Sequence, residues 1–467
     1  MSYDVDDTIT AVATARGPSG IGIVRLCGHQ ARSILAQMFR PSQSRSTDTW
    51  TSHTARHGWI SDGRLTIDEV IVTYFQKPCS YTGDETIEIS AHGNPIILDK
   101  ITQLCCAKGA RLAHPGEFTF RAFINGKMDL AEAEAVADII AAKTARAAAA
   151  AMCQLKGAMS QKIELWRKKL IDLLSAIEVS LDYGEENIRF MQTGEIQAEI
   201  AALQSDIGTL LETAAKGMRL RNGLRVCIAG SPNVGKSSLL NALLERDRAI
   251  VSDIPGTTRD VIEELLDIQG FPVVISDTAG LRTHTSDPLE KSGHERTIQS
   301  LKSADVILWL TDTSRPRSPQ DMTVGNILTT ETSSARIIVV GTKIDLPCGL
   351  TDCPTLKISS KTGEGIKDLE AAIVSVAGSV TPDSADPLVT SIRHQDALVR
   401  AQSALKATDT LFFEKHTADA ASSAGDSDDV LIAEQLREAL NALGEITGET
   451  TPEDILENIF SRFCVGK

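Results

Sequence analysis

The sequence lacks any continuous apolar run of the ~18 residues that a membrane-spanning helix needs. Its first residues, Met1–Asp7, are acidic, with neither the apolar core of a secretory signal nor the Arg-rich composition of a transit peptide. The nine cysteines form no Cys-x-x-Cys pair and no Cys/His cluster at zinc spacing. These absences argue against a membrane protein and a zinc protein, and they predict a reduced, cytoplasmic location.

The sequence also lacks an excess of positive charge, because 47 Lys and Arg residues face 62 Asp and Glu residues, for a net charge of -15. A protein that coats nucleic acid through a uniformly basic surface is therefore excluded, whereas a local basic patch or a basic partner stays open. Hydrophobic residues at 42% and charged residues at 23% exclude wholesale disorder. With 467 residues, the chain is expected to divide into about three domains.

The residue composition of the first part of the chain changes once, after residue 125. Residues 1–125 mix short β-type runs with Gly/Pro turns, which predicts an α+β domain. The runs are Ile21–Leu26, Glu69–Phe75 and Thr86–Ser90. Residues 126–221 are rich in Ala, Glu, Lys and Leu, with apolar positions at three- and four-residue steps, and predict helices that pack as a bundle.

From residue 222 to residue 380, short apolar strands alternate with helical segments, as in a parallel α/β sheet. The predicted strands are Val226–Ala229, Val273–Ser276, Val306–Leu310, Ile337–Val340 and Leu356–Ile358. Residues 381–467 return to a helical pattern, and Lys415–Asp429 is expected to form a solvated loop between two helices.

One motif follows the first predicted strand of this α/β region. Gly230–Ser237 matches the phosphate-binding pattern G-x-x-x-x-G-K-[ST] and precedes a predicted helix. Backbone N–H groups and the helix N-terminus then bind phosphates, Lys236 neutralises their charge, and the Ser237 hydroxyl ligates Mg²⁺. An incidental Gly-rich turn is disfavoured because further nucleotide-binding elements follow in order.

Two of those elements concern magnesium and the γ-phosphate. Pro255–Asp260 resembles the switch I segment of translation-factor-related GTPases, in which Thr258 completes the magnesium sphere. Asp277–Gly280 reads Asp-Thr-Ala-Gly at the end of a predicted strand, which places Asp277 near magnesium and the Gly280 N–H near the γ-phosphate.

Two more elements concern the base. Thr342–Asp345 resembles the guanine-reading NKxD element, in which Asp345 accepts two nitrogen donors that adenine does not offer together. Thr342 stands where that element has Asn, a departure expected to weaken base contacts. Ser359–Lys361 resembles the last guanine-contact loop. Together the four elements predict a Ras-like P-loop G domain with GTP as substrate, inserted into a discontinuous helical domain.

Hydrolysis needs a group that orients water and a charge that offsets the transition state. Ras-like enzymes use a glutamine after the DxxG element, whereas Leu281 stands there in this sequence. Another group must therefore orient the water. Asn233 in the phosphate loop is typical of GTPases that use a potassium ion in place of an arginine finger.

Motifs outside the G domain point to one family. Cys464–Lys467 reads Cys-Val-Gly-Lys, and further motifs stand at Asp7–Ile9, Gly20–Arg25, Tyr81–Glu85, His92–Pro95, Arg111–Phe118, Arg121–Glu134 and Gly444–Glu449. They resemble the MnmE (TrmE) family of tRNA-modification GTPases, whose last residues read C-[ILV]-G-K. The resemblance spans essentially the whole chain.

The resemblance implies four segments: an N-terminal α+β domain at 1–125, a helical domain at 126–221 and 381–467, and a G domain at 222–380. It implies that the N-terminal domain dimerises and binds 5-formyl- or methylene-tetrahydrofolate through Arg25, Glu88 and Lys127, with Lys467 nearby. A carboxylate can hold pterin donors, and Arg or Lys suits a glutamate tail.

The resemblance further implies a heterotetramer with the FAD- and NADH-dependent partner MnmG. The two proteins would add an aminomethyl-type group, such as carboxymethylaminomethyl, at carbon 5 of the wobble uridine of certain tRNAs. The acidic balance of this chain would leave much of the tRNA affinity to the partner.

Within the G domain, the resemblance implies potassium ligands at Asn233, Ser252, Ile254 and Thr257, and it aligns Glu290 with a water-orienting glutamate. The complete expected GTP-binding set is Asn233, Val234, Gly235, Lys236, Ser237, Ser238, Ser252, Asp253, Ile254, Pro255, Gly256, Thr257, Thr258, Asp277, Thr278, Ala279, Gly280, Thr342, Lys343, Asp345, Ser359, Ser360 and Lys361. The expected catalytic residues are Glu290, Lys236 and Cys464.

The cysteines have more modest interpretations. Cys464 is either a nucleophile toward a bound one-carbon unit or a small packed residue. Cys348 and Cys353 are interpreted as ordinary reduced thiols.

Two other functions were weighed against tRNA modification. GTPase switches in ribosome assembly of the Era and Der type carry a KH-type RNA-binding module after the G domain, whereas the corresponding region here is helical in pattern. A folate-binding scaffold with vestigial nucleotide binding is disfavoured by the intact Lys236, Thr258 and Asp277. The tRNA-modification GTPase is the preferred hypothesis.

Overall fold

The computed structural model of the protein describes residues 6–42, 50–182, 191–247, 263–277, 298–332, 335–350, 352–378, 387–418 and 425–467. The chain divides into two compact units. The first comprises Met1–Ala137, Ser160–Lys168 and Leu440–Lys467, and the second comprises Asp138–Met159 and Lys169–Ala439. Among the helices in the described ranges, none combines the length and the apolar character needed to cross a membrane.

The first unit contains a seven-stranded sheet with the order β3-β4-β5-β6-β2-β1-β7. Its strands are β1 (Ile9–Val12), β2 (Ser19–Cys27), β3 (Phe39–Pro41), β4 (Thr54–Ser61), β5 (Thr66–Phe75), β6 (Thr86–Gly93) and β7 (Arg111–Leu112). Neighbours pair antiparallel except β1 and β7, which pair parallel. The three predicted strands correspond to β2, β5 and β6, so the α+β prediction is confirmed.

Helices complete this unit. They are α1 (Ala31–Ala36), α2 (Pro95–Ala107), α3 (Glu117–Ile124), α4 (Leu130–Ala141), which continues into the second unit, and α15 (Glu453–Ser461). The side chain of Asn94 caps α2 by accepting from the Ile96 N–H at 2.9 Å. Helix α15 packs on α3 through Phe120 and Phe460, whose ring centroids lie 5.3 Å apart. This packing brings the residues after α15 to the sheet.

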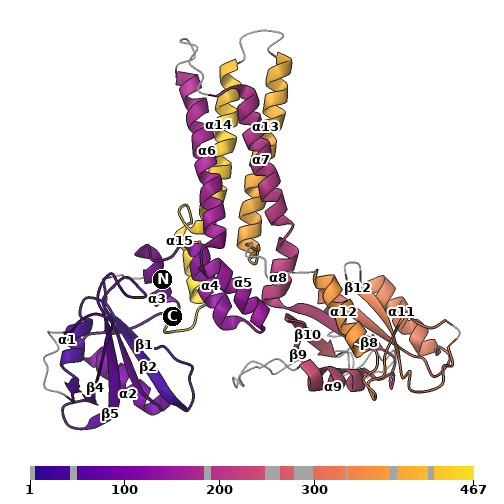
Figure 1. Cartoon of the computed structure of the whole chain (residues 1–467), viewed down its shortest axis with the longest axis horizontal. Coiled ribbons are helices and arrows are strands. Elements are labelled where there is room, and N and C mark those ends of the chain that lie inside the picture. Colours follow the sequence, from indigo (N-terminus) through magenta and orange to yellow (C-terminus); the bar gives the residue numbers. More distant parts are fainter. Residues whose placement is uncertain are drawn as a thin grey trace, which may run out of the picture. The chain divides into compact units, whose positions relative to one another are not determined.

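A helical bundle belongs mainly to the second unit. Its helices are α5 (Ala145–Leu155), α6 (Ala158–Asp182), α7 (Thr193–Leu211), α8 (Ala214–Asn222), α13 (Ile392–Ala418) and α14 (Gly425–Thr447). Parts of α6 and α14 also belong to the first unit. Figure 1 shows α6, α7, α13 and α14 running side by side. Gln204 of α7 donates to the Leu405 carbonyl of α13 at 2.8 Å. Helices from both sides of the G domain in sequence therefore share one bundle, as the predicted discontinuous helical domain requires.

The loop predicted at Lys415–Asp429 is shorter than expected. Helix α13 continues through Ala418 and α14 begins at Gly425, so both ends of the predicted loop are helical. Alanine has high helix propensity, and the aspartates after Gly425 favour a helix N-terminus. The polar composition was therefore a poor guide to the length of the loop.

The second unit also holds a six-stranded sheet with the order β13-β12-β11-β8-β10-β9. Its strands are β8 (Leu224–Gly230), β9 (Glu263–Ile268), β10 (Phe271–Asp277), β11 (Val306–Asp312), β12 (Arg336–Thr342) and β13 (Leu356–Lys357). All neighbours pair parallel except β9 and β10. The five predicted strands and the mostly parallel sheet are confirmed, whereas the antiparallel edge strand β9 was not predicted.

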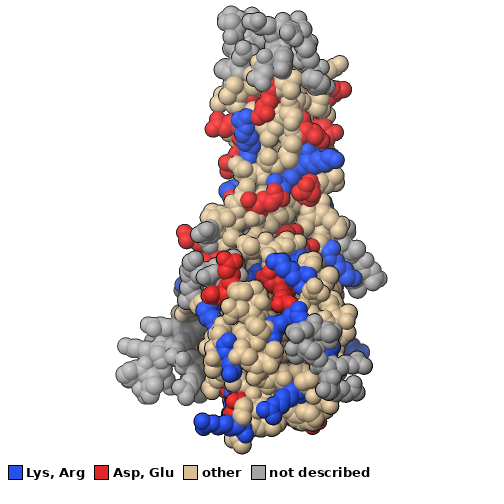
Figure 2. Space-filling view, turned by 90° about the vertical axis from the view of Figure 1, so that its left-hand side faces the viewer, with Lys and Arg blue, Asp and Glu red and all other residues tan. Residues whose placement is uncertain are grey.

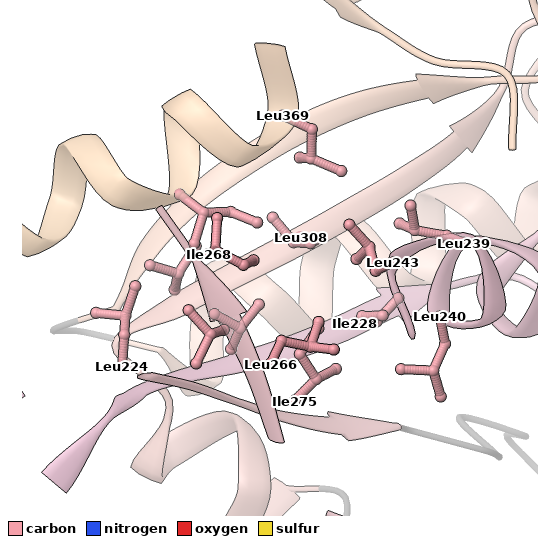
Figure 3. Packing of buried hydrophobic residues seen from close by; sticks show 14 of the residues in the cluster. Leu224, Ile228, Leu239, Leu240, Leu243, Leu266, Ile268, Ile275, Leu308 and Leu369 are labelled. Carbon is pink, nitrogen blue, oxygen red and sulfur yellow. The ribbon is translucent and has the colours of Figure 1, made fainter. Parts of the chain in front are cut away.

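Apolar residues cover both faces of this sheet. Six of the seven residues of β8 are buried, because α9 (Lys236–Asp247), α11 (Pro319–Glu331) and α12 (Ile366–Ala377) pack around the sheet. In Figure 3, Leu239 and Leu243 from α9 and Leu369 from α12 lie over the strand residues Ile228 and Leu308. The core therefore fixes the start of α9 against the end of β8, where the phosphate-binding motif lies.

Candidate functional site

The phosphate-binding motif forms a tight turn between β8 and α9. Gly235 has a φ of +107°, a conformation that L side chains rarely adopt, and Asn233 has a φ of +61°. Val234 is fully buried between them. Lys236 is the first residue of α9, and its Nζ donates to the carbonyls of Gly230 at 2.9 Å and of Ser231 at 3.0 Å. The turn therefore brings a lysine ammonium and a helix N-terminus together, which is a suitable arrangement for phosphates.

Only part of the expected magnesium and γ-phosphate machinery can be located. Asp277 ends β10, and its backbone lies beside Ile228 in the neighbouring parallel strand β8. Ser237 lies exposed in the first turn of α9. The other expected residues of this part, Ser252–Thr258, Thr278–Gly280 and Glu290, lie outside the described residues, as does Leu281. Of the placed residues, Ser237 has an exposed hydroxyl at the start of α9, a hard oxygen donor that fits a magnesium ion.

Thr342 connects the base-recognition element to the phosphate loop. It ends β12, is 2% exposed, and its Oγ1 donates to the Val234 carbonyl at 2.7 Å. The carbonyl of Thr342 in turn accepts from the Thr313 hydroxyl at 2.7 Å. Thr342 was expected to weaken contacts because it replaces Asn. The structure does not test that expectation, but it shows that the Thr342 hydroxyl fixes the backbone of the phosphate loop.

The structure brings Asp345 and Ser359, two of the residues predicted to recognise the base, into contact. Asp345 Oδ1 accepts from the Ser359 hydroxyl at 2.8 Å, and Ser359 is fully buried. Ser360 is half-buried and Lys361 is exposed in the turn that follows. This bond occupies one oxygen of Asp345, so the second carboxylate oxygen keeps its acceptor capacity.

Three charged residues beside this site, Asp312, Arg315 and Asp321, were not predicted from the sequence. Asp312 ends β11 and lies 2.7 Å from Lys343 Nζ. Burial acts to raise the pKa of Asp312, but hydrogen bonds from Lys343 and Ser314 outweigh it, and the pKa is lowered. Arg315 reaches the Ser231 hydroxyl of the phosphate loop at 3.4 Å and lies 3.7 Å from Asp321.

Asp312 could have been found from the sequence, because it ends a strand, and polar residues at the carboxyl ends of parallel strands meet at one edge of the sheet. Arg315 and Asp321 lie in the connection that follows, where no motif marked them.

A second cluster lies on the sheet of the first unit. Arg25 on β2 stands opposite Glu88 on β6, and its Nε and Nη2 donate to Glu88 Oε1 at 3.0 and 2.8 Å. The same guanidinium lies 5.4 Å from the ring centroids of Tyr81 and Phe118. Its Nη1 donates to the Gly466 carbonyl at 3.2 Å. One side chain therefore joins the sheet to the Cys464–Lys467 segment.

That segment is seated closely on the sheet. The backbone of Val465 forms an isolated antiparallel β-bridge with Pro115. Gly466 has a φ of +100°, and an added Cβ at this position would lie 2.3 Å from the Val12 carbonyl oxygen. Lys467 Nζ lies 5.8 Å from the Tyr81 ring centroid. Burial lowers the pKa of Lys467, and the neighbouring Arg25 cation lowers it further, while Glu88 acts in the opposite direction. Two cations against one carboxylate make the cluster suitable for an anionic ligand.

The other expected residues of this cluster differ in placement. Lys127 is exposed, and its Nζ donates to the Pro78 carbonyl at 3.3 Å, so it contacts the loop that leads to Tyr81 instead of Arg25 itself. Cys464 is exposed, and its carbonyl accepts from the Lys467 N–H at 3.2 Å. The structure therefore brings Arg25, Glu88 and Lys467 together and leaves Lys127 beside them.

Comparisons with known proteins cover almost the whole chain. Residues 8–127 match the model of the GTP-binding protein TrmE N-terminus, and residues 130–464 match the model of the MnmE helical domain. The chain is 40% identical to the tRNA modification GTPase MnmE of Symbiobacterium thermophilum, over 99% of this chain and 100% of that protein. It is 42% identical to the tRNA modification GTPase MnmE of Clostridioides difficile, with the same coverage.

A solved structure of Aquifex aeolicus Era is 27% identical over 38% of this chain and 66% of that chain, with a TM-score of 0.27. The full-length identities and the two family models decide the assignment. The chain belongs to the MnmE (TrmE) family of tRNA modification GTPases.

Proposed function

We propose that this tRNA modification GTPase depends on potassium and works with an FAD-dependent MnmG partner. The two proteins would add an aminomethyl-type group, such as carboxymethylaminomethyl, at carbon 5 of a wobble uridine, using a tetrahydrofolate one-carbon unit. The main supporting observation is the hydrogen bond that the Thr342 hydroxyl donates to the Val234 carbonyl at 2.7 Å. This bond joins the guanine-reading element to the phosphate loop. A base and its phosphates can thus be held by one edge of the sheet.

The described residues have separate tasks in nucleotide binding. Asp345 keeps an acceptor oxygen for the two guanine nitrogen donors, because Ser359 occupies only Oδ1. Lys236 and the N–H groups at the start of α9 would hold the β- and γ-phosphates. The tie through Thr342 would keep the distance between these two groups constant.

Two metal ions are part of the proposal. Magnesium would be held by Ser237 and Thr258 and would neutralise phosphate charge. Potassium would be held by Asn233, Ser252, Ile254 and Thr257. Asn233 lies at the turn of the loop, where its backbone has a φ of +61°. The residue is exposed there, and this accessibility to an ion supports the role. Glu290 would orient the attacking water.

The cluster on the first sheet is the proposed folate site. Arg25 and Lys467 would bind a carboxylate of the ligand, Glu88 would face pterin donors, and Lys127 would contact the ligand from the neighbouring loop. The lowered pKa of Lys467 supports this assignment, because an anionic ligand would stabilise its charged form. Cys464 stands beside this cluster as a candidate nucleophile toward a bound one-carbon unit.

The assembly is proposed as a homodimer of this chain that forms a heterotetramer with MnmG and acts on tRNA in the cytoplasm. The segment limits 1–125, 126–221, 222–380 and 381–467 are part of the same proposal. Figure 2 shows Lys and Arg side chains interspersed with Asp and Glu on one face. Mixed charge on that face, with a net charge of -15, is consistent with a partner that supplies much of the tRNA affinity.

The test is GTP turnover by the purified chain in potassium chloride and in sodium chloride at equal ionic strength. A strong dependence on potassium is expected. Equal turnover in the two salts would refute the potassium site around Asn233.

A second arm tests base recognition. Asp345→Asn presents an amide donor to the base, so turnover should shift from GTP toward XTP, whose carbon 2 carries an oxygen acceptor. An Asp345→Asn enzyme that keeps its preference for GTP would refute the role of Asp345.

A further inference from the structure

Cys348 and Cys353 are close together in the connection between β12 and β13. Their sulfur atoms lie 3.0 Å apart, Cys348 is exposed, and Cys353 is half-buried. From the sequence alone, both were interpreted as ordinary reduced thiols. A dithiol can be oxidised when its sulfurs are in reach of each other and of solvent, and this pair meets both conditions.

The two thiols are not equivalent. The hydrogen bond with Cys353 lowers the pKa of Cys348, while the same contact raises the pKa of Cys353. The nearby Lys357 also favours the Cys348 thiolate. Since the thiolate is the reactive form, Cys348 is the thiol that attacks first, and Cys353 is the thiol that follows.

The pair lies between two residues of the proposed guanine site. Cys348 follows Asp345 closely in the sequence, and the chain after Cys353 leads through β13 to Ser359, which donates to Asp345 at 2.8 Å. The loop is also fixed to the end of β11, because the Gly349 N–H donates to the Thr313 carbonyl at 2.8 Å. A change in this loop therefore acts on Asp345 and on Ser359, which holds the Asp345 carboxylate in place.

Formation of a disulfide would change the contacts inside the loop. The sulfurs of Cys348 and Cys353 lie 3.6 and 3.7 Å from the Leu350 carbonyl, which the S–H group of either thiol can contact as a donor. A disulfide has no S–H group, so both contacts would be lost, and the sulfurs would approach to ~2.05 Å. The loop must then rearrange beside Asp345.

We propose that Cys348 and Cys353 form a reversible disulfide that weakens guanine-nucleotide binding. The Cys348 thiolate attacks one sulfur of a low-molecular-weight disulfide, which forms a mixed disulfide and releases one thiolate. Cys353 then loses its proton and attacks the Cys348 sulfur, which releases the second thiolate. The protein thiols are oxidised by two electrons, and the small disulfide is reduced to two thiols. The effect on nucleotide binding rests on the proposed role of Asp345, whereas the disulfide itself does not.

The chemistry is tested by treating the full-length chain with oxidised glutathione and digesting it with trypsin. The peptide Ile344–Lys357 contains both cysteines. In the wild type, this peptide should become lighter by two hydrogen atoms, carry no glutathione, and return to its first mass after dithiothreitol.

Two variants sharpen this test. Cys353→Ser should keep glutathione on Cys348, while the matched control Cys79→Ser, which removes another exposed cysteine, should give the wild-type result at this peptide. A wild-type peptide that carries stable glutathione, or that stays unmodified while Cys79 reacts, would overturn the proposal.

The effect on binding is tested with a fluorescent GDP analogue. Oxidation of the wild type should weaken affinity by about fivefold, a typical size for coupling between neighbouring sites. Cys348→Ser should bind equally before and after oxidant. Reduced wild type that binds no GDP would count against the proposed function, whereas a disulfide that forms without changing affinity would overturn the proposed effect of this pair.

Discussion

The two sheets of the molecule build their sites in opposite ways. In the six-stranded sheet, the parallel strands β8, β11 and β12 end at one edge, and the loops after them carry the phosphate and base elements. In the seven-stranded sheet, the cluster lies on the strands themselves, where Arg25 and Glu88 are cross-strand partners. The parallel sheet makes a site from short contiguous segments, whereas the antiparallel sheet makes one from single residues far apart in sequence.

This difference decides what a sequence can reveal. Gly230–Ser237 carries its own geometry, because its glycines, its lysine and the helix that follows are fixed by local sequence. Arg25, Glu88 and Lys467 have no shared pattern, and each alone resembles an ordinary surface charge. Substitutions should therefore act differently in the two regions.

The largest effect is expected at the phosphate loop. Lys236→Ala removes the ammonium that lies across the loop, and GTP turnover should fall by about 10² to 10³, as for other lost transition-state donors. Turnover of saturating GTP with magnesium and potassium measures this. Lys367→Ala, at an exposed position of α12, is the matched control and should keep wild-type turnover. A modest loss in Lys236→Ala would mean that this motif does not act on the phosphates.

The second prediction concerns the hydrogen bond between Thr342 and the Val234 carbonyl of the phosphate loop. Thr342→Val keeps the shape of the side chain but leaves the buried Val234 carbonyl without its donor, at a cost of about 1–3 kcal/mol. Affinity for a fluorescent GDP analogue should fall about tenfold. Thr342→Ser, which retains the hydroxyl, should bind nearly as the wild type does. If the Val and Ser variants bind alike, the hydroxyl has no part in nucleotide affinity.

The third prediction moves the comparison to the antiparallel sheet. Glu88→Gln removes the charge that receives two hydrogen bonds from Arg25, so affinity for 5-formyl-tetrahydrofolate should fall about tenfold. Calorimetric titration of the full-length chain measures this. Glu69→Gln is the matched control, because Glu69 lies on the neighbouring strand β5 and pairs with His57. Equal affinities in the two variants would separate the Arg25 cluster from folate binding.

The smallest effect is expected from the pH dependence of stability. Because the pKa of Lys467 is lowered in the folded state, the unfolded chain binds more protons between that lowered pKa and the ordinary value of 10.5. The free energy of unfolding contributed by this lysine therefore rises with pH through that window. Lys467→Met should flatten the rise, measured by denaturant unfolding at a series of alkaline pH values.

The control for this measurement is Lys100→Met, which changes an exposed lysine of the same unit and should leave the slope as in the wild type. A Lys467→Met slope that matches the wild type would show that this ammonium group is not desolvated in the folded protein.

Much of the fold followed from periodicity and much of the nucleotide site from motifs. The predicted strands around Val226, Val273 and Val306 were found because buried parallel strands read as short apolar runs. Strand β9 was missed because Glu263, Glu264 and Asp267 interrupt its apolar residues at the edge of the sheet.

The contacts that complete the sites were less visible. The roles of Asp312 and Arg315, and the approach of Cys348 to Cys353, depend on how connections fold back onto the sheet. No local pattern of residues encodes that path. Thr342 was read only as a departure from a motif, since its bond to Val234 joins residues 108 positions apart.

The bond between Arg25 and the Gly466 carbonyl has a consequence for the order of folding. These partners are separated by 441 positions, so the first sheet can form during synthesis long before its last contact is available. The closure entropy for so distant a contact must be offset by α15, which packs on α3 and delivers the segment. The cluster around Arg25 is thus completed last, and a chain released early would carry a folded sheet with an unfinished site.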